Sequence, residues 1–344
     1  MSNETTSKGI RRELFSLLGM LGAFLLVIVL LPTTAQAQVP PEVVAFIDLK
    51  CYGITGPDGL PLPPLNVPLQ LDHLNPLFQQ MVPPLPPENV LVFDPVQLCV
   101  PVAKNGVVPP QEVLDFVRFL DLKCYNILDP TTGGPLPPLG LDLIVTHLNR
   151  VLIGLGAQPE FVTMFEPQKL CVPVAKNGVL PPPGSLAFDF VSFVDQKCYN
   201  IAGARLNLPL NLLHLNPVLR DRTDVPPTED VFVADAQQLC VPVKKNQLPP
   251  PTPVVDAVSN LDLKCYAITD VFGGPLPPLG ITLTLTHLNP VLRSMPTVPP
   301  DEFVVVQEPQ QLCVPVSKSL PPPPAPAASA RSSQRVLAGN GPLR

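Results

Sequence analysis

Three short sequence motifs recur four times in the same order, and this repetition restricts the chain to an architecture of four similar units. Every copy opens with Asp-x-Lys-Cys-Tyr, has His-Leu-Asn near its centre and closes with Leu-Cys-Val-Pro-Val. A regular period of about 70 residues is typical of tandem copies of one small unit. We assign the copies to residues 38–106, 107–179, 180–247 and 248–319.

The two ends of the chain differ in composition from the repeats. Residues 1–37 combine basic residues, an apolar run from Leu14 to Leu31 and the sequence Ala35-Gln36-Ala37. This order predicts a cleaved secretory signal peptide. Because the run is nearly long enough to cross a bilayer, retention as an anchor is the alternative. Residues 320–344 are rich in Pro, Ala and Ser, and we expect a disordered tail.

All eight cysteines belong to the repeats, two in each copy. An even number of cysteines in an exported chain predicts disulfide bonds. Because a unit of about 60–70 residues buries little surface, we expect these bonds to be structural. The favoured scheme closes each copy on itself and pairs Cys51 with Cys99, Cys124 with Cys171, Cys198 with Cys240, and Cys265 with Cys313. The alternative joins neighbouring copies, for example Cys99 with Cys124, and leaves Cys51 and Cys313 to meet from opposite ends of the chain.

Proline makes up 51 of the 344 residues. The prolines cluster between apolar segments and exclude helices of ordinary length from much of the chain. Between the clusters, apolar and polar residues alternate with period two, as in 141–146 and 281–286, which predicts half-buried strands. The connections at 105–112, 177–186 and 246–254 favour extended spacers. The predicted fold is all-β, with four tandem small disulfide-stapled β-domains joined by proline-rich linkers.

The third copy lacks a segment that the other three contain. From its first cysteine to its histidine it spans 16 positions, against 22, 23 and 22 in the other copies, because it has no Pro-Leu-Pro-Pro sequence. A connection that varies while its flanking strands persist is typical of a surface loop. We expect no ligand site common to all copies to depend on it.

One histidine recurs at the same position of each copy: His73, His147, His214 and His287. A zinc site needs three or four converging ligands, and neither a second histidine nor a nearby free cysteine accompanies each of these. We therefore predict a structural role, in which the histidine and the asparagine two positions later cap a turn. Metal binding and a response to pH remain the alternatives, and we expect no cofactor.

The tyrosines Tyr52, Tyr125, Tyr199 and Tyr266 each follow a cysteine, and regularly spaced exposed rings could contact a ligand. The interpretation that we favour is that each ring covers a proline of a neighbouring loop. Recurring charges lie five positions on either side of the second cysteine, and we interpret them as solvated strand ends. They are Lys104, Lys176, Lys245 and Lys318 on one side and Asp94, Glu166, Asp235 and Glu308 on the other.

The recurring Lys-Cys-Tyr, acidic-Pro-x-x-Leu-Cys and Val-Pro-Val-x-Lys segments, covering about residues 45–318, resemble a bacterial secreted tandem-repeat family known as a domain of unknown function. The resemblance implies a signal peptide and export, and it implies no activity. The relatives have Asp-Gln-Phe at the central position where this chain has His-Leu-Asn, so no role for the histidines follows from it.

The sequence contains no Gly-x-Ser-x-Gly, His-Glu-x-x-His, phosphate-binding glycine loop or calcium-loop pattern. We therefore predict a secreted, non-enzymatic structural or adhesive protein of the extracellular space or cell envelope. The alternative is a carbohydrate- or envelope-binding array that uses exposed tyrosines, and a metal-binding protein or enzyme is a third hypothesis. The partner would be a glycan or a protein. The net charge of −6 argues against nucleic acid, and after signal cleavage we expect no stable membrane insertion.

Overall fold

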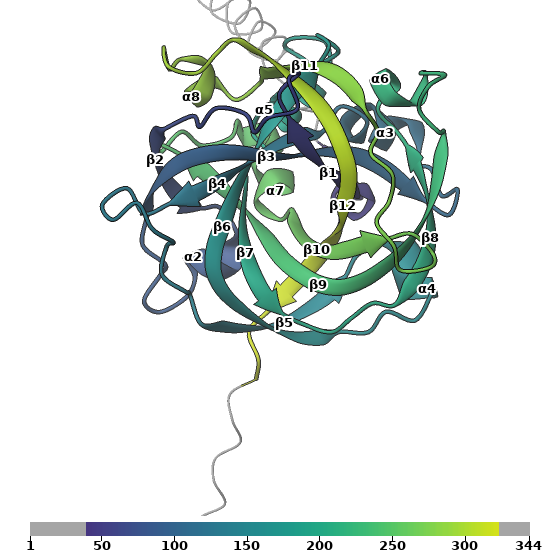
Figure 1. Ribbon diagram of the computed structural model, residues 1–344. Helices are drawn as coiled ribbons and strands as arrows, with labels where there is room; N and C mark the ends of the chain where they lie inside the picture. Colours follow the sequence, from purple (N-terminus) through teal and green to yellow (C-terminus); the bar gives the residue numbers. More distant parts are fainter. Residues whose placement is uncertain (1–38, 323–344) are drawn as a thin grey trace, which may run out of the picture. The chain divides into compact units, whose positions relative to one another are not determined.

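The computed structural model describes residues 39–322, so the predicted signal peptide and most of the predicted disordered tail lie outside the described residues. These residues are mostly β-structure, and twelve strands pair into one sheet (Figure 1). The strands are β1 (Leu49–Thr55), β2 (Val67–His73), β3 (Glu88–Lys104), β4 (Asp121–Leu128), β5 (Leu141–His147), β6 (Glu160–Lys176), β7 (Gln196–Ala202), β8 (Leu208–His214), β9 (Thr228–Lys245), β10 (Asp262–Thr269), β11 (Ile281–His287) and β12 (Asp301–Ser319).

Each repeat contributes two short strands and one long strand. The first strand is antiparallel to the third in a register that sets the two cysteines opposite each other, as Cys51 is to Cys99. The middle strand pairs with the N-terminal half of the third, as β2 does with β3. The alternating segments at 141–146 and 281–286 are the middle strands β5 and β11, as the sequence predicts.

Eight of the strands form a closed ring. The pairing runs through β1, β3, β4, β6, β7, β9, β10 and β12, and β12 pairs back with β1. Each first strand therefore lies between the long strand of its own repeat and that of the preceding repeat. Closure of a sheet on itself removes the free edges at which strands could recruit other chains. The ends of the repeat region meet because β1 and β12 are neighbours.

The middle strands connect repeats that lie two apart in the sequence. They pair with the C-terminal ends of the long strands: β2 with β9, β8 with β3, β5 with β12, and β11 with β6. The long strands have 17 to 19 residues and extend beyond their partners within the repeat, so their ends have hydrogen-bonding groups for another strand. The expectation of four separate small β-domains is therefore corrected to one interlocked sheet.

Short helices follow the proline-rich connections that the sequence predicts as extended spacers, and they begin within the last three residues of each predicted spacer. The helices α3 (Gln111–Val117), α5 (Leu186–Ser192) and α7 (Thr252–Ser259) follow the proline clusters, and the 3-10 helix η2 (Val44–Phe46) precedes the first repeat's strands. Proline is compatible with the position just before a helix, and each cluster is followed by an apolar segment that can be buried. Among residues 39–322, no helix is long and apolar enough to cross a bilayer.

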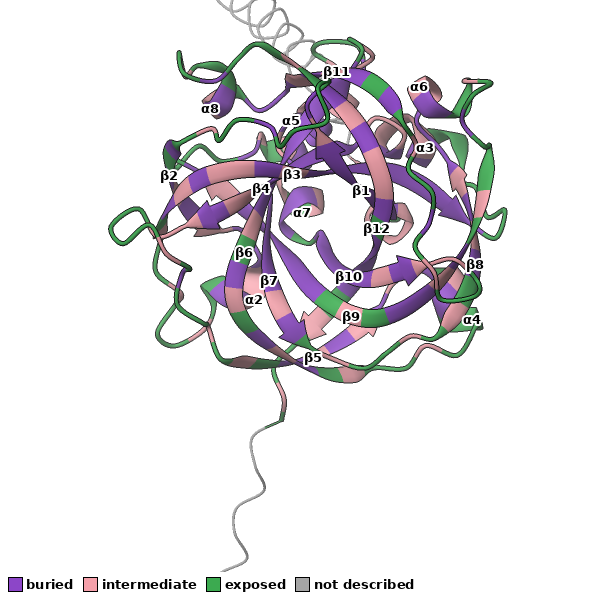
Figure 2. Cartoon of the chain, in the orientation of Figure 1, coloured by how far each residue is buried: buried purple, intermediate pink, exposed green. Residues whose placement is uncertain are grey.

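Figure 2 shows that buried residues occur along most of the strands. They form one cluster that contains the disulfides, which we call central, and four others, which we call peripheral. The central cluster combines all eight cysteines with apolar side chains of the connecting helices, such as Val113, Phe190 and Val254. Each peripheral cluster contains one of the four repeated tyrosines. Because successive side chains of a strand point to opposite faces, a cysteine that faces the inside of the ring places the following tyrosine on the outside.

The Pro-Leu-Pro-Pro segment is more than a surface loop, because its leucine is buried in three peripheral clusters as Leu62, Leu136 and Leu276. The cluster around Tyr199, the tyrosine of the third copy, has no such leucine. It contains Phe78 at the position where the other clusters have a leucine from a short helix. A larger side chain thus occupies the cluster in which the loop leucine is absent, which keeps the interior filled.

Candidate functional site

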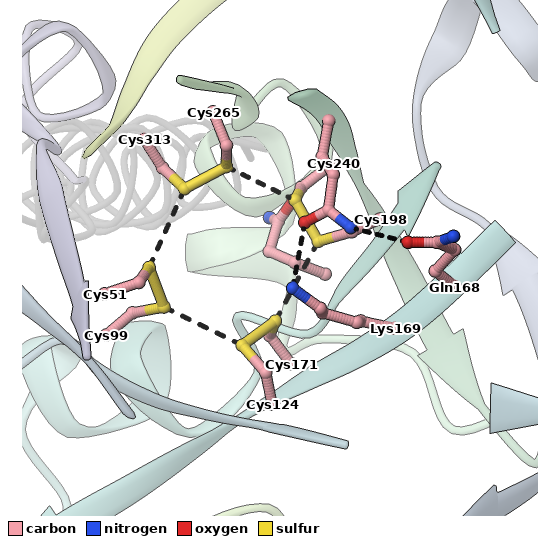
Figure 3. Close-up of a disulfide and its surroundings, with 12 residues drawn as sticks. Cys51, Cys99, Cys124, Gln168, Lys169, Cys171, Cys198, Cys240, Cys265 and Cys313 are labelled. Carbon is pink, nitrogen blue, oxygen red and sulfur yellow. Dashed lines mark hydrogen bonds between the residues drawn. A yellow bond between two sulfur atoms is a disulfide. The ribbon is translucent and has the colours of Figure 1, made fainter. Parts of the chain in front are cut away.

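The four disulfides lie inside the ring of strands. They join the two cysteines of each repeat, in the pairs that the sequence analysis favours. Figure 3 shows the eight sulfurs as a ring of their own, in which sulfurs of neighbouring bridges lie 3.7 to 3.8 Å apart. The alternative partners, such as Cys99 with Cys124 and Cys51 with Cys313, are therefore also in contact. Only closure of the ring brings together these last two residues, which are 262 positions apart.

The four tyrosines are buried, with exposed fractions of 0 to 2%. Each hydroxyl forms a hydrogen bond with a histidine from the repeat two positions away, at 3.0 to 3.2 Å. The pairs are Tyr52 with His214, Tyr125 with His287, Tyr199 with His73, and Tyr266 with His147. The interpretation of these rings as ligand-facing is therefore corrected, because side chains of other repeats cover the outer face of the ring on which they lie.

A lysine and a glutamate complete each Tyr–His cluster. The lysine two positions before the tyrosine places its Nζ 4.6 to 4.9 Å from the centre of the tyrosine ring and pairs with a glutamate. The ion pairs are Lys50–Glu229, Lys123–Glu302, Lys197–Glu88 and Lys264–Glu160. Burial lowers the pKa of Lys50, Lys123 and Lys197 to about 7, whereas the adjacent carboxylate favours the charged form.

The imidazoles of these clusters are neutral at physiological pH. Burial is the main cause that lowers the pKa of His73, His214 and His287 to about 3 and that of His147 to about 4, and two nearby lysines add to each shift. Burial likewise raises the pKa of the tyrosines. Among residues 39–322, no group of three or more histidine, cysteine or acidic side chains is placed to hold a metal ion.

A second set of buried polar groups joins neighbouring repeats, and we call these groups the seams. In each seam, the aspartate of an opening motif pairs with the lysine that follows the second cysteine and accepts a hydrogen bond from an asparagine of the next repeat. The seams are Asp48–Lys104–Asn149, Asp121–Lys176–Asn216, Asp195–Lys245–Asn289 and Asp262–Lys318–Asn75.

The seams correct the interpretation of these lysines as solvated, because Lys104, Lys176 and Lys245 are at most 1% exposed. Burial raises the pKa of Asp121 to about 6 and lowers that of Lys176, while attraction within the pair opposes both shifts. The asparagines also cap the short helices α2 (Pro76–Gln79), α4 (Arg150–Gly154), α6 (Pro217–Arg220) and α8 (Pro290–Arg293). Capping is thus confirmed for the asparagine of His-Leu-Asn, whereas the histidine bonds to a tyrosine.

The remaining polar groups inside the ring form an open cavity, which we call the mouth. Alternate residues of a long strand face the same side, so Gln97, Cys99, Pro101 and Ala103 follow one another along the inside of the ring. The alanine packs in the central cluster with the helices, and the glutamine lies on the other side of the sulfurs. The mouth has a volume of about 550 Å³ and is lined by Gln97, Gln168, Lys169, Asn200, Gln237, Gln238, Gln310 and Gln311.

One charged side chain lies among these amides. The residue two positions before the second cysteine is Gln97, Gln238 or Gln311 in three repeats and Lys169 in the second. The Lys169 Nζ donates to the Oε1 atoms of Gln97 at 2.8 Å and Gln238 at 3.3 Å, next to the sulfur ring (Figure 3). Burial lowers the pKa of Lys169 to about 8.

The sequence analysis missed the mouth. The sequence signal for the mouth is the recurrence of glutamine two and three positions before the second cysteine. On a strand, the residue two positions before a cysteine points to the same face as that cysteine. Glutamine belongs to no catalytic or metal-binding motif, so the pattern does not stand out beside histidines and tyrosines. Comparison with protein-family models, curated proteins and solved structures found no match to this chain.

Proposed function

We propose that this protein is a secreted, non-enzymatic binding protein that takes a small polar ligand in the mouth. The observation that carries the proposal is the contrast between the mouth and the rest of the interior. Amide groups and one ammonium line an open cavity of about 550 Å³, a volume within the range typical of small-molecule sites. The other polar groups of the repeat motifs are committed to one another in the seams and the Tyr–His clusters.

The chemistry of the lining supports binding rather than catalysis. The described residues that line the mouth are glutamines, one asparagine and one lysine, and they include no carboxylate, imidazole, hydroxyl or thiol. Proton transfer and covalent catalysis mostly use those groups. Amides supply both donors and acceptors of hydrogen bonds, which suits the recognition of polar molecules.

Export is supported by the N-terminal sequence, by the resemblance to a secreted repeat family, and by the four disulfides, which persist in oxidising compartments. The repeats interlock in one sheet and share one mouth, so each chain would supply one such site. Avidity between tethered copies within a chain has no support from this arrangement.

The test is a binding measurement on the mature chain with glucose, glucuronate, succinate and phosphate, followed by amide chemical shifts in NMR spectra. At least one probe is expected to shift resonances of the mouth. Gln237→Leu, at an exposed position of the mouth, and Gln238→Leu should abolish the response. Gln158→Leu, outside the mouth, serves as the matched control because its side chain is also exposed.

The proposal predicts that only the two mouth variants lose the response of the NMR spectrum to the probes. No response to any of the four probes, or a response that persists in both Gln237→Leu and Gln238→Leu, would contradict it. Thermal unfolding of each variant shows whether a lost response reflects a lost fold.

A further inference from the structure

One residue departs from the fourfold repetition of the mouth, and the fold does not require this departure. Lys169 occupies the register position that Gln97, Gln238 and Gln311 occupy in the other repeats. The strand pairing is the same at these positions: Lys169 is opposite Cys198, as Gln97 is opposite Cys124 and Gln238 is opposite Cys265. Since the ring of strands forms with glutamine at this position in three repeats, the fold does not explain why the second repeat has a lysine there.

The charge of Lys169 is also unlike the other buried charges. Every other lysine among residues 39–322 forms a salt bridge with an aspartate or glutamate. Lys169 instead donates to two amide oxygens. An ammonium has three N–H donors, so its partners among the described residues leave one donor and the full positive charge unmatched. A partly buried ammonium without a counter-charge is unfavourable, and an anion in the mouth would supply the missing partner.

We propose that the ligand of the mouth is a hydroxylated carboxylate of the size of a sugar acid, with its carboxylate on Lys169 and its hydroxyls on the glutamines. This inference rests on the proposed function and specifies the ligand class. Hydroxyl groups donate and accept hydrogen bonds, as glutamine amides do, so the two match in number and kind. A small inorganic anion would leave most of the amides without a ligand partner, and a neutral sugar would leave the ammonium without a counter-charge.

The test uses calorimetry with glucuronate and glucose, which differ in one carboxylate. The unmodified chain should bind glucuronate at least about tenfold more tightly than glucose, as expected for a charge-assisted hydrogen bond. Lys169→Gln introduces the residue that the other repeats carry at this position, so the variant should fold normally. It should lose the preference for glucuronate and bind the two sugars with similar affinity.

A charge-relocation variant separates the position of the charge from its presence. In Lys169→Gln/Gln311→Lys the lysine moves to the equivalent position of the fourth repeat, and the preference for glucuronate should return. Equal affinity of the unmodified chain for the two sugars, or a preference that persists in Lys169→Gln, would overturn the inference while binding itself stands. If neither glucuronate nor glucose binds, the inference that the ligand is a hydroxylated carboxylate is overturned. The response to succinate and phosphate then decides whether the mouth binds polar ligands at all.

Discussion

Lys169 and Lys176 lie seven positions apart on the same strand, β6, and have opposite surroundings. Lys176 and its partner Asp121 are completely buried, and Asn216 donates to the same aspartate at 2.7 Å. Lys169 lies in the open mouth. Among the described residues, its hydrogen-bond acceptors are two amide oxygens, those of Gln97 and Gln238. The charge of the first lysine is neutralised by a carboxylate of its own repeat, whereas in our proposal the second keeps its charge for a ligand.

The same contrast applies to the two polar regions as a whole. The seams and the Tyr–His clusters contain the residue types that are most often catalytic, and these are paired with one another, with the glutamates of the clusters 15 to 27% exposed. The mouth contains amides, which rarely react, yet all the residues that line this open cavity are polar. In our proposal, the ligand is therefore bound by the less reactive of the two sets of polar groups.

The largest expected effect of a single substitution is at the seam. Lys176→Ala leaves the Asp121 carboxylate buried without its counter-charge, and we expect a loss of about 3–5 kcal/mol in the free energy of unfolding. Lys169→Ala removes a charge that has no carboxylate partner, and we expect a change below about 1 kcal/mol. Urea unfolding of the two variants measures both values. Similar losses would show that the two lysines do not differ as the structure indicates.

The next effect concerns the disulfides that separate the mouth from the apolar core. Replacement of Cys124 and Cys171 together by alanine removes one bridge and should cost about 2–5 kcal/mol of stability. The strand register on both sides is also held by backbone hydrogen bonds, so the variant should still fold and keep a mouth. Urea unfolding gives the loss, and probe binding tests the mouth. A variant that is as stable as the unmodified chain would contradict a structural role for the bridges.

A smaller effect is expected in the Tyr–His clusters. Tyr199→Phe removes the hydroxyl bonded to His73 and leaves a buried ring nitrogen without its partner, which should cost about 1–3 kcal/mol. Gln237→Ala, at an exposed position in the mouth, should change stability by less than about 0.5 kcal/mol. Thermal unfolding compares the two variants. If Gln237→Ala were the more destabilising, the mouth would be part of the scaffold.

The smallest expected effect is spectroscopic and depends on pH. Lys169 should titrate near pH 8, whereas the imidazoles should stay neutral down to about pH 5 because burial lowers their pKa to about 3 or 4. In the unfolded chain a histidine binds its proton near pH 6.5. Between about pH 6.5 and pH 3 the unfolded state therefore binds more protons, and the stability that the neutral imidazoles contribute is lost as the pH falls.

Histidine and lysine side-chain NMR resonances measure these titrations directly. They are preferable to an unfolding curve, because the buried Asp121, with its pKa raised to about 6, contributes in the opposite direction within the same pH range. A histidine that titrates above pH 6 would show that its cluster is open to water.

Several features of the fold follow from local sequence. The period-two alternation identifies β5 and β11, and the turn cap predicted at His-Leu-Asn corresponds to a helix N-cap formed by the asparagine. The pairing of cysteines within a repeat follows from the presence of two cysteines in every copy. The contacts across the ring have no such local signal: the hydroxyl of Tyr52 bonds to His214, 162 positions away. Neither residue type nor spacing along one repeat identifies a partner in another repeat.

The sequence by itself determined the four repeats, their β-structure, the within-repeat disulfides and the asparagine caps, because these depend on spacing and on interactions between near neighbours. Tertiary structure decided that the repeats close into a single interlocked ring, that tyrosines and lysines of the motifs are buried, and that glutamines surround an open mouth. The physical reason is that burial and pairing depend on which surfaces meet when the ring closes. A residue that looks exposed within one repeat is covered by another.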